Sequence, residues 1–362
     1  MSEHFQRPQR LNWPDLPMPT ARVACLIYIL LIIYASTFPF NFNVGVGAGP
    51  LDWIFAPIPR YITSFDVFTN ILGYLPFGFL VVFAAYPRLR AYRAVLLAVV
   101  MGGLLSGVLE SLQTWLNTRV PSNIDWWTNV GGTTLGALLA VPMDPKWLSG
   151  SAFHHRRIQW FGPRSSGVLL ALSFPLAQIY PQPAWLAMGD WVDVWQTTSL
   201  WRETFNFATV EIVTTMVAWF ASAICIALAM RDRAPKAMIL STLLLVTVFF
   251  KALFTGMQFG VDKSLAWLTP SAFWGMVASN ILLIGALKLS RKWLYLLALI
   301  ALVGMIFLVN FLPQSPYYIV SIQEWRHGRL IHFNHLISWM AWLWPIGAGL
   351  SLLKGLKPLS SI

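Results

Sequence analysis

Three polar pairs in the first part of the chain have the residue types and the spacing for acid–base chemistry or ligand binding. The pairs are Asp66 with Asn70, Glu110 with Gln113, and Asp125 with Asn129. Residues three or four apart lie on one face of an α-helix, so each pair presents a carboxylate next to an amide. Two carboxylates in different environments can divide the roles of acid and base.

A guanidinium and a helix end add to this pattern. Arg119 lies between the second and third pairs and can bind a carboxylate bidentately. Glu110 is expected near a helix C-terminus, where the helix dipole disfavours a negative charge. Glu110 is therefore expected to have a role beyond capping, with Arg119 as a partner.

The two aspartates also have a purely structural interpretation. Asp66 and Asp125 each stand where an apolar segment begins, so either can be an N-cap or a first-turn acid that the helix dipole favours. Ser64 and Ser122 compete for the same capping position. The sequence leaves capping and ligand chemistry open for both aspartates.

The composition requires a membrane as the solvent for most of the chain. Only 11% of the 362 residues are charged, against about 25% in an average soluble protein. Apolar residues make up 57% and aromatic residues 15%, which also excludes a disordered chain. The two cysteines, Cys25 and Cys225, stand inside apolar runs, so neither a disulfide framework nor a cysteine metal site is expected. We expect no cofactor and no metal.

Ten apolar segments are candidates for membrane spans, since about 20 mostly apolar residues cross a bilayer. They are Val23–Phe38, Val67–Ala85, Ala94–Leu112, Trp126–Val141, Gly167–Tyr180, Phe207–Ala229, Ala237–Phe254, Ser271–Leu287, Trp293–Leu312 and Leu336–Leu353. The prediction is an all-α, polytopic helical bundle with about ten transmembrane helices. The fourth and fifth segments are short and also fit tilted, re-entrant or interfacial helices.

Basic residues orient these segments, because Lys and Arg are retained on the cytoplasmic side. With ten spans, 18 basic residues fall on the side that holds both termini and 7 on the other, which accounts for all 25. Both termini are therefore predicted to be cytoplasmic. The net charge of +11 is then a consequence of topology, and no nucleic-acid partner is expected. All three polar pairs and Arg119 fall at the outer boundary of the membrane.

Two stretches that carry the polar pairs resemble the motifs of VanZ-like membrane proteins. Phe65–Gly78 is similar to the first motif of that family. Glu110–Gln113 looks like the second motif, together with Arg119, Ser122, Asp125, Asn129 and Gly132–Gly136. Phe38-Pro39-Phe40 is similar to a short aromatic-proline segment of the family. The resemblance covers about residues 25–143.

The resemblance implies a domain organisation and a cellular location. The polar, proline-containing start of the chain predicts a cytoplasmic arm over residues 1–20, and the later apolar segments predict a C-terminal membrane domain of about six helices over 146–362. The resemblance predicts a VanZ-like four-helix membrane domain over 21–145. It also implies the inner (plasma) membrane of a bacterium. The family is named for glycopeptide resistance of the teicoplanin type, an activity that few of its members have.

Two hypotheses for the function follow, from different classes of protein. The first is a non-catalytic envelope protein that binds or organises a lipid-linked or cell-wall component at the outer face of the membrane. The second is an intramembrane enzyme, with Glu110 and either Asp125 or Asp66 as acid and base on a lipid-linked headgroup. A transporter is a third option. The expected partners are membrane lipid and a lipid-linked or cell-wall glycan precursor.

Three further features have mainly structural interpretations. Glycines in the third and fourth segments, from Gly102 to Gly136, are expected to let those two helices approach closely. The tryptophans of the outer segment from Tyr180 to Asn206 fit interfacial anchoring, and with its carboxylates they also fit sugar binding. His327, His332 and His335 lack the carboxylate pattern of a metal site and are expected to make interfacial contacts.

Overall fold

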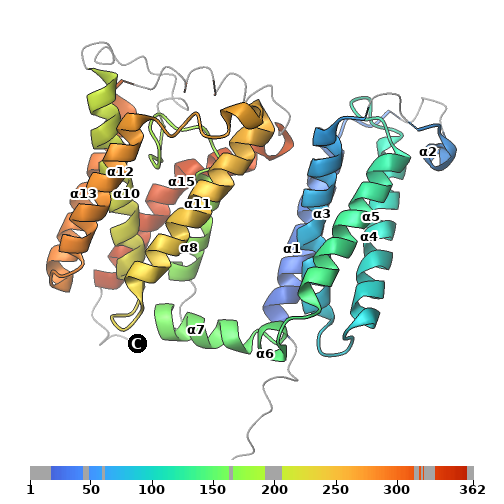
Figure 1. Cartoon of the computed structure of the whole chain (residues 1–362), viewed down its shortest axis with the longest axis horizontal. Coiled ribbons are helices and arrows are strands. Elements are labelled where there is room, and N and C mark those ends of the chain that lie inside the picture. The colour runs from blue at the N-terminus through green and yellow to red at the C-terminus, as the bar shows by residue number, and fades with distance from the viewer. Residues whose placement is uncertain are drawn as a thin grey trace, which may run out of the picture. The chain divides into compact units, whose positions relative to one another are not determined.

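The chain is helical throughout the residues that the computed structural model describes, which confirms the predicted fold class. These are residues 18–43, 49–58, 62–162, 166–191, 206–313, 318, 321 and 331–356. Outside the helices, one isolated antiparallel bridge joins Phe42 to Leu116. The chain divides into an N-terminal unit, Met1–Arg156, and a C-terminal unit, Arg157–Ile362. The described parts of both units consist mainly of helices (Figure 1).

Four long helices and two short ones form the N-terminal unit. They are α1 (Pro19–Thr37), α2 (Asp52–Phe55), α3 (Ser64–Ala85), α4 (Tyr92–Gln113), α5 (Asn123–Ala140) and α6 (Pro145–Leu148). The helix α7 (Ser151–Phe161) follows across the division between the units. The most extensive packing in this unit is between α3 and α5, and α4 and α1 complete the bundle around them (Figure 1).

Glycines let the backbones of α3 and α5 touch. A Cβ atom on Gly136 would overlap the carbonyl oxygen of Leu75, and one on Gly132 would overlap that of Ile71. The predicted close approach between the third and fourth segments is therefore wrong for these two glycines, which face the second segment instead. It holds for Gly102 of α4, where a Cβ would meet the side chain of Thr133. Small residues on both helices allow this proximity without a hydrophobic driving force.

The described residues of the C-terminal unit form six helices, one of which is central. They are α8 (Ser166–Ala177), α10 (Phe207–Ala229), α11 (Lys236–Phe259), α12 (Pro270–Ala286), α13 (Arg291–Phe311) and α15 (Ile331–Leu356), with the 3₁₀ turn η3 (Val261–Lys263) after α11. Helix α10 packs against each of the other five helices, and 67% of the residues in its most apolar 18-residue stretch are buried. Because α10 is apolar on every side, it is suited to the centre of a bundle. The rings of Phe174, Trp219 and Trp344 meet at its middle.

An irregular segment follows α8 and is buried inside this unit. It runs from Gln178 to Trp191, and nearly every residue in it is buried. Trp185 is 1% exposed and stacks on Trp267, so its predicted anchoring at the membrane interface is wrong. Non-helical backbone is tolerated at membrane depth only where protein covers it, which explains the burial. The other part of the predicted tryptophan-rich segment, 192–205, lies outside the described residues, as does His327.

The helices have the length and composition of an integral membrane protein. Six are long and apolar enough to cross a bilayer: α1, α3, α4, α10, α11 and α13. α8, α12 and residues 337–353 of α15 are shorter apolar helices. Each of the ten predicted segments coincides with a helix, α5 included. The crossing of the membrane by all ten stays a prediction.

Candidate functional site

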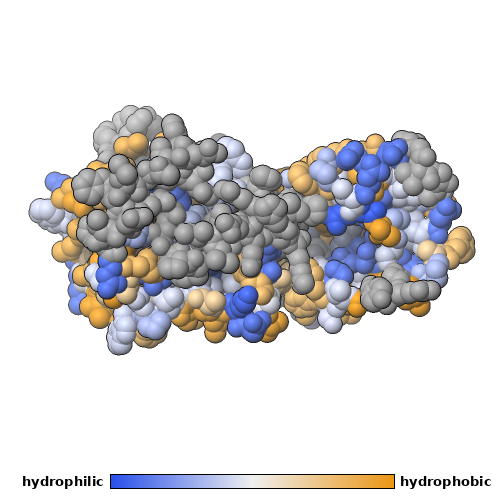
Figure 2. All heavy atoms as spheres, turned by 90° about the horizontal axis from the view of Figure 1, so that it is seen from above, coloured by the Kyte–Doolittle hydropathy of each residue, from blue (hydrophilic) through white to orange (hydrophobic). Residues whose placement is uncertain are grey.

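All seven predicted site residues lie at one end of the N-terminal bundle. This is the end where α3 and α5 begin, where α4 ends, and where the 114–122 loop connects α4 to α5. Figure 2 looks onto the molecule from this side and shows hydrophilic residues gathered on the N-terminal unit among hydrophobic ones. The polar network, as we call it here, consists of these seven residues together with Tyr74, Ser106 and Ser122.

Glu110 connects the end of α4 to the start of α5. Its side chain is only 3% exposed, and its Oε2 accepts a hydrogen bond from the backbone N–H of Ser122 at 2.8 Å. Ser122 in turn caps α5, because its hydroxyl oxygen accepts a hydrogen bond from the backbone N–H of Ile124 at 3.2 Å. A buried carboxylate is stable only with such donors around it. Glu110 thus fixes the loop that shapes this end of the bundle.

The two aspartates have different roles in the structure. Asn70 donates a hydrogen bond from Nδ2 to Oδ1 of Asp125 at 2.9 Å, which joins α3 to α5. Since Ser122 is the N-cap of α5, Asp125 is free to serve this bridge. Asp66 is exposed, and it is tied to Thr63, the N-cap of α3, by hydrogen bonds through both its backbone N–H and its carboxylate. Capping therefore explains Asp66.

The network continues one helical turn further into the bundle. Asn129 is 6% exposed, and its Nδ2 donates to the hydroxyl of Ser106 at 3.0 Å. Tyr74 is buried in α3 one turn after Asn70, and its hydroxyl interacts with Ser106 and with the charge of Glu110. Among the described residues, no donor contacts Oδ1 of Asn129.

The sequence contains a signal for the two network members that were missed. Tyr74 follows Asn70 by four residues, and Ser106 precedes Glu110 by four. Positions four apart share a helix face, so each polar residue at the helix end has a second one a turn away. Extending each polar pair by one turn would have found both.

Gln113 and Arg119 hold the last turn of α1. Nε2 of Gln113 donates to the carbonyl oxygen of Ser36, and an Nη of Arg119 donates to that of Ala35, each at 3.1 Å. The final carbonyl groups of a helix have no partner within it, so these bonds satisfy α1. Burial lowers the pKa of Arg119, and the charges of Asp125 and Glu110 raise it. A direct ion pair of Arg119 with either carboxylate stays a prediction.

An apolar groove of about 630 Å³ borders the polar network. Its walls come from α2, α4 and α5 and include Trp53, Trp126 and Trp127. Nε1 of Trp126 donates a hydrogen bond to the carbonyl oxygen of Gly103 in α4 at 2.9 Å. Gly107 follows one turn later in α4, and because it has no side chain, the ring of Trp126 can also lie close to the helix backbone there. We call this the tryptophan groove.

The groove and the network share the same helix ends. Ser111, next to Glu110 in sequence, lines the groove and accepts a hydrogen bond from Nε1 of Trp53 at 3.2 Å. Asn123, next to Ser122, also lines it and donates to the carbonyl oxygen of Ala56 at 2.8 Å. The groove and the network are thus neighbours at the ends of α4 and α5, although none of the ten network residues lines the groove. In the described part of the chain, no three His, Cys, Asp or Glu side chains are grouped to hold a metal ion.

The fold and the site define an α-helical integral membrane protein with a buried carboxylate–amide network at one end of its N-terminal unit. Residues 25–144 match the family model described as VanZ/LLP1, so this unit contains a VanZ-like domain. The motifs predicted this domain. All seven site residues lie within the match, and the C-terminal unit lies beyond it. No curated protein and no solved structure is significantly similar to the chain.

Proposed function

We propose that the VanZ-like unit binds a lipid-linked or cell-wall component at the outer face of the bacterial inner membrane. The observation that carries this proposal is that the tryptophan groove and the polar network occupy the same ends of α4 and α5. The groove suits the hydrocarbon chain or the apolar face of a ligand, and the network suits its polar head. Pockets that combine an apolar wall with a few placed polar groups are the usual form of a small-molecule site.

The chemistry of the network favours a head with hydroxyl or amine groups. Glu110, Asp125 and the carbonyl oxygen of Asn129 are acceptors of hydrogen bonds, and a glycan offers many donors. Arg119 adds a guanidinium suited to a phosphate. A lipid-linked glycan precursor has all three parts: a chain, a phosphate and a sugar.

The proposed location rests on the distribution of basic residues. If both termini are cytoplasmic, the N-terminal ends of α3 and α5 face outward, and so does the site. Precursors of the cell wall are assembled on lipid carriers that reach this face. A protein that holds such a precursor there would alter its access to a glycopeptide, which is how we propose that this chain could contribute to teicoplanin-type resistance.

Binding to a defined lipid tests the proposal. Full-length protein in nanodiscs is titrated with a fluorescent, short-chain polyprenyl-diphosphate amino sugar, and the dissociation constant is measured by fluorescence anisotropy. Glu110→Gln keeps the shape of the side chain and removes its charge, so we expect affinity to fall about tenfold or more, which equals about 1.4 kcal/mol. Protein yield and thermal stability are recorded alongside.

Glu211→Gln is the matched control. Glu211 is a carboxylate in α10 that is 2% exposed and accepts a hydrogen bond from Thr269 at 2.7 Å, but it lies in the other unit. We expect this variant to bind the lipid as the wild type does. Equal affinity of wild type and Glu110→Gln, or a loss with Glu211→Gln alone, would refute the proposed site. Release of the free sugar during the incubation would instead support the intramembrane enzyme.

A further inference from the structure

The C-terminal unit buries a lysine in the membrane-spanning part of α11. Lys251 is 5% exposed and stands eight residues before the end of the helix at Phe259, which is about 12 Å along its axis. A buried ammonium group is costly unless charged or polar partners surround it. Its surroundings therefore indicate what it is for.

The described residues provide hydrogen-bond acceptors for only two of the three N–H groups of this ammonium group. Its Nζ donates to the carbonyl oxygen of Tyr180 at 2.9 Å and to Oε1 of Gln182 at 3.4 Å. The amide of Gln182 is oriented by its own bond to Gln178, from Nε2 to Oε1 at 2.7 Å. A lysine has three N–H donors, so one donor and the positive charge are left over. No carboxylate forms an ion pair with Lys251 within the described part of the chain.

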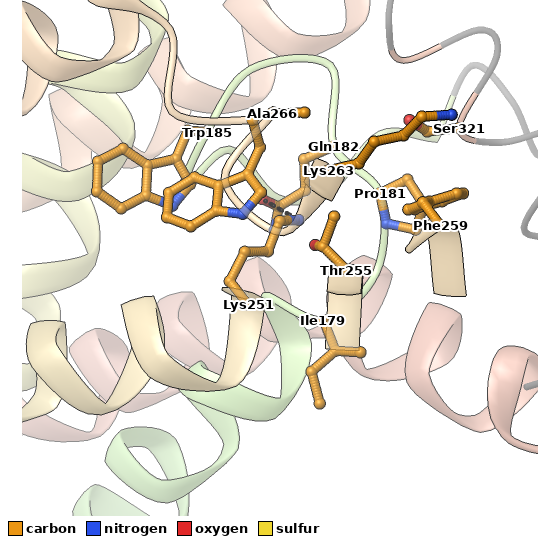
Figure 3. Close-up of a pocket in the computed structure, with 11 residues that line it drawn as sticks. Ile179, Pro181, Gln182, Trp185, Lys251, Thr255, Phe259, Lys263, Ala266 and Ser321 are labelled. Carbon is orange, nitrogen blue, oxygen red and sulfur yellow. Dashed lines mark hydrogen bonds between the residues drawn. The ribbon is translucent and has the colours of Figure 1, made fainter. Parts of the chain in front are cut away.

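Lys251 borders a cavity of about 250 Å³ whose wall is mainly apolar and contains several hydrogen-bond donors (Figure 3). The indole N–H of Trp185 is buried in this wall and has no acceptor among the described residues. Lys263 of η3 stands at the exposed rim, and Thr255 adds a hydroxyl group. None of the described residues that line the cavity is acidic.

We propose that this cavity binds a small anion of the phosphate class, carried by a lipid headgroup or free in solution. Lys251, Lys263 and Trp185 all line it, and an anion would satisfy the charge of Lys251 and the unused donors of Lys251 and Trp185. The volume is below the range of about 300–1,000 Å³ typical of sites for drug-sized molecules. The cavity thus fits a phosphate group and excludes a whole glycan. This site is independent of the one proposed for the VanZ-like unit.

Thermal unfolding of the purified full-length protein tests the site. In detergent, inorganic phosphate is titrated at constant ionic strength against chloride. In a second arm, nanodiscs of phosphatidylglycerol are compared with nanodiscs of phosphatidylcholine. We expect the unfolding temperature to rise with phosphate if the anion is free, or only with phosphatidylglycerol if it belongs to a lipid. No rise in either arm would overturn the proposal.

Three variants connect the effect to the cavity. Lys251→Met should abolish the anion-dependent rise, while Lys263→Met and Trp185→Phe should reduce the affinity severalfold. Trp185→Phe keeps an aromatic ring and removes only the N–H donor. Lys236→Met, at the opposite end of α11, is the control and should respond as the wild type does.

A purely structural lysine would behave differently. In that case Lys251→Met would lower the unfolding temperature equally with and without the anion, and the proposal would be wrong. If Lys251→Met fails to fold, the other two variants decide. An unchanged response in both Lys263→Met and Trp185→Phe would overturn the site, and a weakened response in both would support it.

Discussion

Asn70 and Asn129 bridge helices in the N-terminal unit, whereas Asn310 and Lys251 hold a loop in the C-terminal unit. Asn70 reaches Asp125 from α3 to α5, and Ser106 reaches Asn129 from α4 to α5. In the C-terminal unit, Asn310 of α13 instead binds the backbone at both Gly189 and Trp191. Lys251 does the same at Tyr180. Polar side chains that bridge helices recur at helical spacing in the sequence, whereas those that hold a loop do not.

The apolar packing of the two units differs in the same way. The N-terminal unit brings α3 and α5 together through Gly132 and Gly136, with backbone against backbone. The C-terminal unit surrounds α10 with helices whose large rings, such as Phe174 and Trp344, fill the space. Where small residues bring two helix backbones into contact, a larger side chain does not fit, whereas a core of large side chains can rearrange around a substitution. The N-terminal unit should therefore tolerate substitutions in its interior less well.

Membrane topology is the first test of this comparison, because its readout is all or none. Reporter fusions after Arg119 and after Gly260 should be active only outside the cytoplasm. Fusions after Asp144 and at Ile362 should be active only inside it. The reason is the excess of Lys and Arg on the side that holds the termini. If the reporter were active inside the cytoplasm at Gly260 and outside it at Arg119, the helix ends that carry the two proposed sites would lie on opposite faces of the membrane.

The largest effect on stability is expected for Gly136→Ala. The added methyl group would overlap the backbone of Leu75, so α3 and α5 must separate, at a cost of about 3 kcal/mol or more. Gly131→Ala is the matched control on the same helix, since no atom lies within 4 Å of a Cβ there. Unfolding in mixed detergent micelles measures both. Similar stability of the two variants would contradict the described contact between α3 and α5.

Much of the fold could be predicted from the sequence, because a membrane span is a local property. Ten apolar segments coincide with ten helices, and the spacing of polar pairs led to Glu110, Asp125 and Asn129. The identity of packing partners is not local. Gly132 and Gly136 were expected to face α4 and they face α3, and Trp185 was expected at the interface and is buried.

The lysine cavity could not have been found in the same way. Lys251 stands alone in an apolar segment, and its partners Tyr180 and Gln182 come from an irregular segment 70 residues away. Neither has a periodic position that the sequence could show. Features that depend on a buried loop require the three-dimensional structure, whereas a polar stripe on a helix does not.

A smaller effect is expected when the asparagines that make these contacts are replaced. Asn310→Leu removes hydrogen bonds to Gly189 and Trp191, both at 2.8 Å, and should destabilise the protein by about 2 kcal/mol. Asn70→Leu removes one bond to Asp125 and should cost about 1 kcal/mol, as is usual between membrane helices. The same unfolding assay compares the two. A larger loss for Asn70→Leu would show that the helix bridge, and not the loop attachment, is the more important use of buried amides.

The smallest effect is expected at an exposed ion pair of the C-terminal unit. Asp232 accepts from Arg291 at 2.9 Å and lies 3.8 Å from Lys236, with 79% of its side chain exposed. Exposed pairs contribute about 0–1 kcal/mol, so Asp232→Asn should lower the unfolding free energy by less than 1 kcal/mol, and high salt should shrink the difference further. Arg291→Met should cost more, because Arg291 also donates to the carbonyl oxygen of Leu228 at 3.0 Å. That second bond ties α13 to the end of α10 and does not depend on the carboxylate. Equal, salt-sensitive losses in both variants would show that the ion pair alone matters at this end. If high salt does not remove all of the stability loss in Arg291→Met, the bond to Leu228 matters as well. Polar side chains would then hold backbone groups at the helix ends as they do inside the unit.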